Sequence, residues 1–491
     1  MSGTIFHFRV TRRRWLFRCG AVLLGLSLFV VVEMVCRLLD IGPPAPLEDP
    51  FVGFSEFQPL FQLDESREYR EIRQSRLKFF AAESFAAGKP AGTFRIFCLG
   101  GSTVQGRPFS KDSSFTAFLE LGLQASDPGR DWEVINCGGI SYASYRLVPI
   151  LAECLQYEPD LIILCTGHNE FLEDRTYGHI RDLVPFVSGP MESLSRFRSV
   201  HLYRGLLQSL PGRPQLQPET QLGSEVDARL DYRGGLAAYV RDDVWRDGVM
   251  RHFEFNVNRL LQMADESRIP VLLIQPPSNL ADTPPFKSLP GTGTDVLQLE
   301  QHRRLVETAQ RLQKTDPYGA VAAFEDSMRI DNRQAAVHYQ LGRLLESLGE
   351  NDRARNAFVL ARDNDICPLR ILSPMEVSLK SAAHNWGVPL VDVQTLLASR
   401  TDTGIPGNAW LLDHVHPSID GHEQIALALI QTMAAEQIAV PAADWKGLSA
   451  AAFRRHRSDL PPIYYFKGEQ RLENLRYWTQ GRAEGKSRPS P

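Results

Sequence analysis

The sequence predicts an α/β fold, a doubly wound parallel sheet that is interrupted by an all-α segment. Short apolar runs alternate with amphipathic helical stretches along most of the chain, which is the pattern of parallel strands joined by crossover helices. The run at 161–165 is apolar at every position, as expected of a central strand buried on both faces. Several runs end on glycine or polar residues, and ligands bind at the carboxyl ends of parallel strands in such sheets.

The elements follow one another in a regular order. Glycines or polar clusters bound each apolar run, and helical periodicity marks the stretches between them. We expect strands at 94–99, 132–136, 161–165, 271–275 and 389–393, and helices at 113–123, 144–157, 243–267, 374–385 and 419–434. Residues 171–240 mix Pro, Gly, Arg and aromatic residues, which suggests a long lid-like insertion over the carboxyl face of the sheet.

The composition is that of a globular protein larger than one typical domain. The chain has 491 residues, 43% of them hydrophobic, and a formal net charge of −4, which argues against a role in nucleic-acid binding. The seven cysteines are an odd number and do not form a disulfide framework. Their spacing and that of the histidines suggests no metal site, and we expect no cofactor.

The N-terminal part predicts a membrane anchor. A basic stretch, 1–14, precedes a mainly apolar segment, 15–36, that is long enough to span a bilayer. Because basic flanks stay on the cytoplasmic side, we expect a single-pass protein of the cell membrane with everything after the span outside the cytoplasm, in the periplasm if the cell is Gram-negative. A buried amphipathic helix is the alternative. Residues 37–91 are expected to form a juxtamembrane connector with a helical end.

One segment, 298–365, breaks the alternation because it is helical throughout. Ala320 and Phe324 recur as Ala354 and Phe358, an offset of 34 residues that is the period of the tetratricopeptide repeat. We therefore expect a tetratricopeptide-like insert that packs against the main domain and could recruit a protein partner. A plain helical hairpin in which the match arises by chance is the alternative. The tail, 441–491, carries no chemistry that its residues reveal.

Three polar side chains predict nucleophilic catalysis. Ser102 follows two glycines at the end of the strand 94–99, and Asp413 and His416 stand three residues apart before the helix 419–434. A serine hydroxyl is a poor nucleophile without a base, which His416 can supply while Asp413 orients its imidazole. His414 is the competing base. Taken alone, a glycine turn with a solvated serine and a helix-capping loop would explain the same residues.

Acyl transfer also needs hydrogen-bond donors for the developing oxyanion. The backbone N–H of Ser102 is one candidate, and the side-chain amide of Asn169, at the end of the central strand 161–165, is a second. The glycine-rich turn after Asn136 offers a third donor, a backbone N–H. Asn169 taken alone would more often cap a strand end. The coincidence of four segments at strand ends of one sheet favours the catalytic interpretation.

These residues occur in motifs that resemble those of the SGNH (GDSL-like) hydrolases, in particular a membrane-anchored bacterial branch with tetratricopeptide repeats inside the hydrolase domain. The resemblance implies a flavodoxin-like sheet made of two parts, 92–297 and 366–440. It also implies Ser102 as nucleophile, His416 as base, Asp413 as its partner and Asn169 as an oxyanion donor. The second-block donor aligns best with Ser141, with Gly139 as the alternative. The four motifs are Gly100-Gly101-Ser102-Thr103, Asn136-Cys137-Gly138-Gly139-Ile140-Ser141, Gly167-His168-Asn169-Glu170 and Asp413-His414-Val415-His416.

Two residues depart from the usual pattern of that family without removing a catalytic group. Gly101 stands where the family has the acidic residue of Gly-Asp-Ser, and Glu170 stands where it has aspartate. We therefore expect a serine-dependent ester hydrolase acting on an acyl ester at the outer face of the membrane. An O-acyltransferase that uses an envelope polysaccharide is one alternative. A non-catalytic scaffold that binds through its repeats is another.

Overall fold

The computed structural model describes residues 27, 29–36, 49, 51–54, 58–175, 220–231 and 235–479. The chain divides into two compact units, 1–53 with 175–221, and 54–174 with 222–491. Most of the predicted membrane segment, 15–36, and much of the predicted lid, 171–240, lie outside the described residues. Among those that are described, no helix combines the length and the apolar character needed to cross a bilayer. The strands β1 (Gly53–Phe54) and β8 (Gln221–Leu222) lie at the sequence boundaries between the units.

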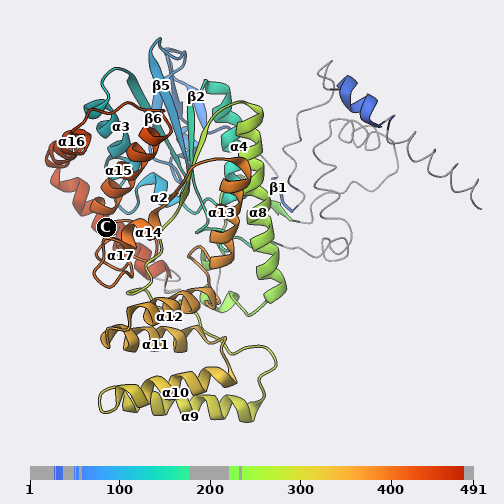
Figure 1. The fold of residues 1–491 in the computed structure, drawn as a ribbon. Helices are drawn as coiled ribbons and strands as arrows, with labels where there is room; N and C mark the ends of the chain where they lie inside the picture. Colours follow the sequence, from blue (N-terminus) through green and yellow to red (C-terminus); the bar gives the residue numbers. More distant parts are fainter. Residues whose placement is uncertain are drawn as a thin grey trace, which may run out of the picture. The chain divides into compact units, whose positions relative to one another are not determined.

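The larger unit contains a parallel five-stranded sheet (Figure 1). Its strands pair in the spatial order β10-β9-β7-β5-β6, so that β5, the first of them in the sequence, has β6 on one side and β7 on the other. This is the doubly wound topology with its switch point at β5, and the predicted parallel sheet is confirmed. The strands are β5 (Thr93–Gly100), β6 (Asp131–Gly138), β7 (Leu161–Cys165), β9 (Val271–Gln275) and β10 (Leu390–Asp392).

Helices cover both faces of this sheet, which explains why β7 and β9 are buried at every position. Figure 1 shows a layer of helices on each face. One layer is α3 (Phe115–Ser126), α15 (Ile419–Ala435) and α16 (Trp445–Asp459). The other is α4 (Ser144–Cys154), α8 (Asp243–Glu266) and α13 (Ser373–Trp386). Shorter helices are α2 (Ser102–Gln105), α14 (Val393–Ala398), η1 (Gln74–Arg76), η2 (Lys111–Ser113), η3 (Leu155–Tyr157), η4 (Arg229–Asp231) and η5 (Gly235–Ala238).

The segment predicted as a connector with a helical end folds onto the α/β unit over residues 58–91. It forms an antiparallel sheet of β2 (Phe61–Leu63), β3 (Tyr69–Ile72) and β4 (Ser84–Ala86). The buried Phe61 and Phe85 pack against Phe97 of β5. The carboxylate of Glu153 also accepts hydrogen bonds from the N–H groups of Leu60 and Phe61, at 2.6 and 2.9 Å. Aromatic residues of the segment that was expected to be a connector therefore belong to the core.

The predicted helical insert consists of two consecutive helical hairpins, α9 (Val296–Leu312) with α10 (Pro317–Ile330) and α11 (Ala335–Ser347) with α12 (Asn351–Asp363). The residues that recur at the offset of 34 share one apolar cluster, in which Ala320, Phe324, Ala354 and Phe358 are all buried. Leu280 and Ala281, from the loop after β9, belong to the same cluster. The insert is thus packed on the α/β unit next to the end of a sheet strand.

The C-terminal residues up to 479 complete the α/β unit. Phe453 of α16 is part of the main core cluster and lies 5.0 Å, ring to ring, from Phe118 of α3. The last helix, α17 (Pro462–Thr479), contacts the loop after α2, where Phe109 fits against Gly468 so closely that a Cβ on that glycine would lie 2.0 Å from the ring. The part of the tail that the structure describes is therefore integral to the domain.

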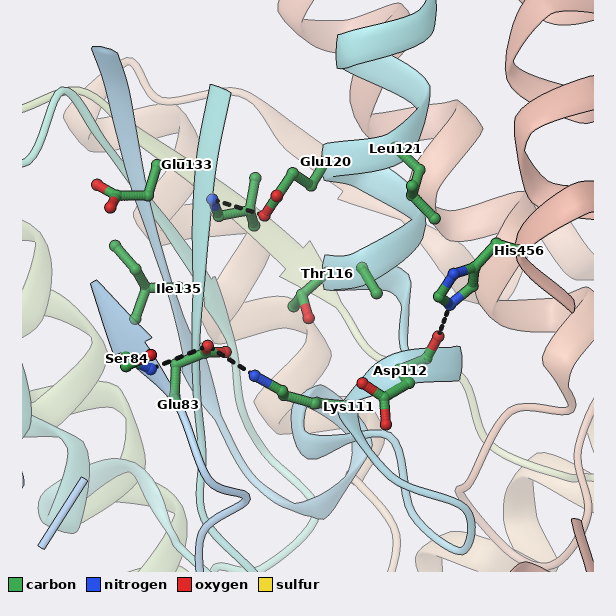
Figure 2. Close-up of a pocket in the computed structure, with 12 residues that line it drawn as sticks. Glu83, Ser84, Lys111, Asp112, Thr116, Glu120, Leu121, Glu133, Ile135 and His456 are labelled. Atoms are coloured by element: carbon green, nitrogen blue, oxygen red, sulfur yellow. Dashed lines mark hydrogen bonds and ion pairs between the residues drawn. The ribbon is translucent and has the colours of Figure 1, made fainter. Parts of the chain in front are cut away.

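Side chains satisfy the open edge of the sheet at β6. The carboxylate of Glu120 accepts a hydrogen bond from the N–H of Val134 at 3.1 Å, and that of Glu83 accepts one from Asn136 at 3.2 Å. Figure 2 shows both carboxylates beside the edge strand, together with Lys111, which pairs with Glu83. Capping these donors blocks the pairing of a further strand. The hollow lined by these side chains contains neither Ser102 nor His416.

Glu120→Gln tests this capping through pH. Burial, the largest contribution, raises the pKa of Glu120 to about 7. In the unfolded chain the Glu120 carboxyl loses its proton near the ordinary pKa of 4.5, whereas in the folded state it keeps the proton up to about pH 7. The wild type therefore loses stability relative to the variant as the pH rises through this range. We expect similar free energies of unfolding at pH 4 and an advantage of ~1–3 kcal/mol for Glu120→Gln at pH 8 in denaturant titrations. If the difference in free energy of unfolding between the two proteins is the same at pH 4 and pH 8, the raised pKa of Glu120 is wrong.

Candidate active site

The candidate nucleophile lies at the switch point of the sheet, where β5 turns into the one-turn helix α2. Two glycines, Gly100 and Gly101, make this turn sterically possible. A Cβ on Gly100 would lie 2.2 Å from the carbonyl oxygen of Cys165 in the neighbouring strand, and one on Gly101 would lie 2.5 Å from the side-chain nitrogen of Asn169. Only glycine lets the chain come this close to β7 and its end. Ser102, the first residue of α2, is thereby held next to Asn169 and is 8% exposed.

The acid–base pair comes from the loop before α15. One carboxylate oxygen of Asp413 accepts hydrogen bonds from the N–H groups of Val415 and His416, both at 2.9 Å, which folds the loop back on itself. The other oxygen lies 2.7 Å from Nδ1 of His416. The spacing of three residues thus places the carboxylate beside the imidazole and fixes the ring.

The structure brings Ser102, His416 and Asp413 into one hydrogen-bonded chain. Nε2 of His416 lies 2.7 Å from Oγ of Ser102, on the opposite side of the ring from Asp413. Burial by itself would raise the pKa of the Asp413 carboxyl, but the imidazoles of His416 and His414 and its hydrogen bonds outweigh burial and hold that pKa below its usual range. An ionised Asp413 keeps the proton on Nδ1, so that Nε2 is the acceptor facing the serine hydroxyl.

His414, the competing base, occupies a different environment. Its Nδ1 lies 3.6 Å from the other oxygen of Asp413, and its ring packs edge-on against Phe286 at 5.2 Å. Burial lowers the pKa of His414 to about 4, which keeps the ring neutral near pH 7. No hydrogen bond joins it to Ser102 in the part of the chain that the structure describes. The geometry therefore places His416, and not His414, next to the hydroxyl.

Two candidate oxyanion donors flank the hydroxyl. Ser102 is at the first position of α2, where a backbone N–H has no partner within the helix. The amide of Asn169 uses one hydrogen to bond the carbonyl of Tyr142 at 3.0 Å, which fixes the side chain beside Gly101 and leaves a second N–H. Tyr142 is itself held by a 2.8 Å hydrogen bond from the buried Arg76 to its hydroxyl.

The glycine-rich motif at 136–141 leaves one of its two candidate N–H groups available as an oxyanion donor. The N–H of Gly139 donates to the carbonyl of Gly100 at 2.9 Å, and the N–H of Ile140 donates to Phe79 at 2.8 Å. Ser141 has a left-handed backbone, with φ of 62°, and its N–H bonds no group among the described residues. Of the two alternatives, Gly139 is therefore occupied and Ser141 is available to donate.

The unusual Glu170 has a structural role. Its carboxylate accepts hydrogen bonds from the N–H and the hydroxyl of Ser144, at 2.8 and 3.0 Å, and Ser144 is the first residue of α4. A buried carboxylate at a helix N-terminus satisfies free N–H groups and interacts favourably with the helix dipole. Glu170 thus ties the end of β7 to α4 and keeps the neighbouring Asn169 in place.

Asn279, in the loop after β9, supports the acid–base loop and was not among the residues that the motifs suggested. Its side-chain nitrogen donates to the carbonyl of Asp413 at 3.0 Å and to Oδ1 of Asn408 at 2.9 Å. Its backbone N–H donates to the carbonyl of His414 at 3.0 Å, and the residue is fully buried. The only sequence signal was a polar residue shortly after an apolar strand, which does not reveal a partner 134 residues away.

No protein-family profile matches the chain, and no curated protein is detectably similar to it in sequence. Solved structures do resemble it. An acetylxylan esterase from Geobacillus stearothermophilus shows 14% identity and a TM-score of 0.31, covering 70% of this chain and 94% of the esterase. A protein described as lipolytic, of the G-D-S-L family, from Desulfitobacterium hafniense shows 12% identity and a TM-score of 0.30, and the match covers 69% of this chain and 98% of that protein. A protein described as a GDSL-like lipase from Parabacteroides merdae shows 11% identity and a TM-score of 0.33, and the match covers 69% of this chain and 94% of that protein.

Asn279→Ala tests the support of the acid–base loop. We expect kcat for a small activated ester to fall ~10- to 100-fold with little change in KM, because the loop that carries His416 loses a tether while the crevice keeps its shape. The matched control is Asn258→Ala on α8, which removes the acceptor of a hydrogen bond donated by Trp386 of α13. Both rates are measured below the melting transition of each variant. A rise in KM at constant kcat would show that Asn279 does not act through the base.

Proposed function

We propose that the chain is a serine-dependent ester hydrolase of the SGNH type, with Ser102 as nucleophile, His416 as base and Asp413 as its partner. The observation that supports it is the pair of 2.7 Å contacts that links the Ser102 hydroxyl through His416 to Asp413. The side chains of all three are buried at the carboxyl end of a parallel sheet, next to an amide and two backbone N–H groups that are free to donate. Each of these groups has a role in acyl transfer.

In the proposed reaction, Oγ of Ser102 attacks the acyl carbon while its proton moves to Nε2 of His416. The oxygen that gains negative charge is stabilised by the N–H groups of Ser102 and Ser141 and the amide of Asn169. His416 then gives its proton to the departing alcohol, which leaves an acyl-serine. Water attacks this ester with His416 again acting as base, and the carboxylic acid and free Ser102 result.

Substitutions of the three residues test the proposal on full-length protein with a para-nitrophenyl ester. We expect Ser102→Ala and His416→Ala to lower kcat by a similar factor, ~10⁶-fold, because nucleophile and base act as a unit, and Asp413→Asn to cost less, ~10⁴-fold. Ser267→Ala, which removes an exposed hydroxyl that donates to the carbonyl of Met263 at the end of α8, is the control. Wild-type rates in Ser102→Ala would exclude this serine as the nucleophile.

We further propose that residues 15–36 anchor the protein in the cell membrane with the hydrolase outside the cytoplasm. The support is the order of the sequence, a basic stretch followed by a mainly apolar segment. A reporter enzyme that works only outside the cytoplasm, fused after the C-terminus, should be active. Reversing the charges of the arginines before the span should reduce this activity, whereas the same changes in α9 should not. A reporter active only in the cytoplasm would contradict the proposed orientation.

A further inference from the structure

Arg107 is a partly buried cation that makes no ion pair with an acid among the described residues. It directly follows the turn after α2, and its backbone N–H donates to the carbonyl of Ser102 at 3.1 Å. Its side chain is half-buried, yet within the described residues its guanidinium neither pairs with a carboxylate nor makes a hydrogen bond. None of its nitrogen atoms is sealed from solvent. A ligand can therefore reach the charge of this residue, whose backbone lies just beyond the end of α2.

Other arginines of the α/β unit show what a buried guanidinium ordinarily finds. An unpaired charge in a low-dielectric environment is costly, and proteins usually pair it. Five deeply buried arginines each have a carboxylate within 4.0 Å: Arg76 with Glu225, Arg95 with Glu133, Arg146 with Glu173, Arg362 with Glu376 and Arg370 with Asp365. Arg107 lacks such a partner.

A second cation lies beside it. Arg471 of α17 donates to the carbonyls of Pro108 and Phe109, so its guanidinium is fixed on the loop that Arg107 begins. Arg471 has no carboxylate partner within the described residues either. Burial, and then the charge of Arg471, lower the pKa of Arg107. Two like charges held together by the fold, with no acid between them, form a place that an anion would stabilise.

The helix that carries Arg471 also reaches the acid–base loop. Arg476, about one and a half turns further along α17, donates to the carbonyl of Leu412 at 3.0 Å, next to Asp413. The helix therefore runs from the loop behind the nucleophile to the loop that holds the base. Arg107 and the contacts of Arg471 thus belong to the loop that directly follows α2, the helix that begins with Ser102.

We propose that Arg107 and Arg471 form an anion subsite that binds a carboxylate or phosphate group of the ester substrate. This inference rests on the proposed ester hydrolysis and adds a substrate class to it, an ester whose alcohol or acyl part carries a negative charge. A guanidinium pair suits such groups because each arginine presents a planar fork of donors to two oxygens.

Matched esters test the subsite and show which part of the substrate carries the charge. The alcohol side is probed with acetates of a methyl glucuronide and of the neutral methyl glucoside, the acyl side with mono-para-nitrophenyl glutarate and para-nitrophenyl pentanoate, and phosphate with an acetylated sugar phosphate. We expect the wild type to have a higher kcat/KM for the charged member of at least one pair. Arg107→Gln should reduce that preference about tenfold or more, and Arg107→Lys should reduce it less.

The control removes the same charge elsewhere. Arg251→Gln, on the exposed face of α8, should keep the wild-type preference, because a general effect of net charge would change both variants equally. Absence of any preference in the wild type, or an equal loss of preference in Arg251→Gln, would overturn the subsite. Hydrolysis that depends on Ser102 but shows no preference for charge would leave the proposed function intact.

Binding separates the subsite from catalysis. In full-length Ser102→Ala protein, sodium glucuronate or inorganic phosphate should raise the melting temperature, whereas glucose and sodium chloride at equal ionic strength should not. Arg107→Gln in the same background should remove the increase while melting no lower than its parent without ligand, since it deletes an unpaired cation. If no ester is hydrolysed but the anion still stabilises through Arg107, the proposed function fails and the subsite stands. An equal increase in both proteins would overturn the subsite.

Discussion

The hydrogen bond between Ser102 and His416 joins residues that are 314 positions apart, and much of the α/β unit serves to hold its two ends together. On one side, close packing of β5 against β7 forces the glycine turn that presents the serine. On the other, Asp413 folds its own loop and Asn279 ties that loop to the end of β9. Neither side has a catalytic geometry alone. The sheet supplies it because β5, β7 and β9 are parallel neighbours whose carboxyl ends lie together.

Local patterns were sufficient to predict the sheet and the three residues that meet in it. The apolar runs of β7 and β9 have the bounds expected for them, and β5 and β6 differ from the expected bounds by one or two residues at their ends. Such runs report burial directly, and helical periodicity reports the layers that cover them. Ser102, Asp413 and His416 could be named because each follows or precedes a recognisable element, and the topology does the rest.

Other features depend on contacts that no local pattern encodes. The aromatic residues at 58–91 look like a connector until β2 and β4 pack them against Phe97. The N–H of Gly139 donates to the carbonyl of Gly100, which leaves the N–H of Ser141 as the free donor, and the sequence alone does not show this contact. The role of Asn279 depends on its hydrogen bond to Asp413, and that proposed for Arg107 depends on the absence of an acid beside it. Only the folded chain reveals either feature. α17 likewise joins loops that lie 50 or more residues before it, so the tail seemed without chemistry.

The helical insert meets the site through the same loop that carries Asn279. Tyr339 of α11 donates to the carbonyl of Ala281 at 2.8 Å, and the N–H of Asp282 donates to the side-chain oxygen of Asn279 at 2.9 Å. Asn279 in turn holds Asp413. A short series of hydrogen bonds therefore runs from the insert to the acid–base loop. Because each contact in this series is direct, a displacement of α11 would act on this loop, which makes the loop the physical route by which the insert could influence the site.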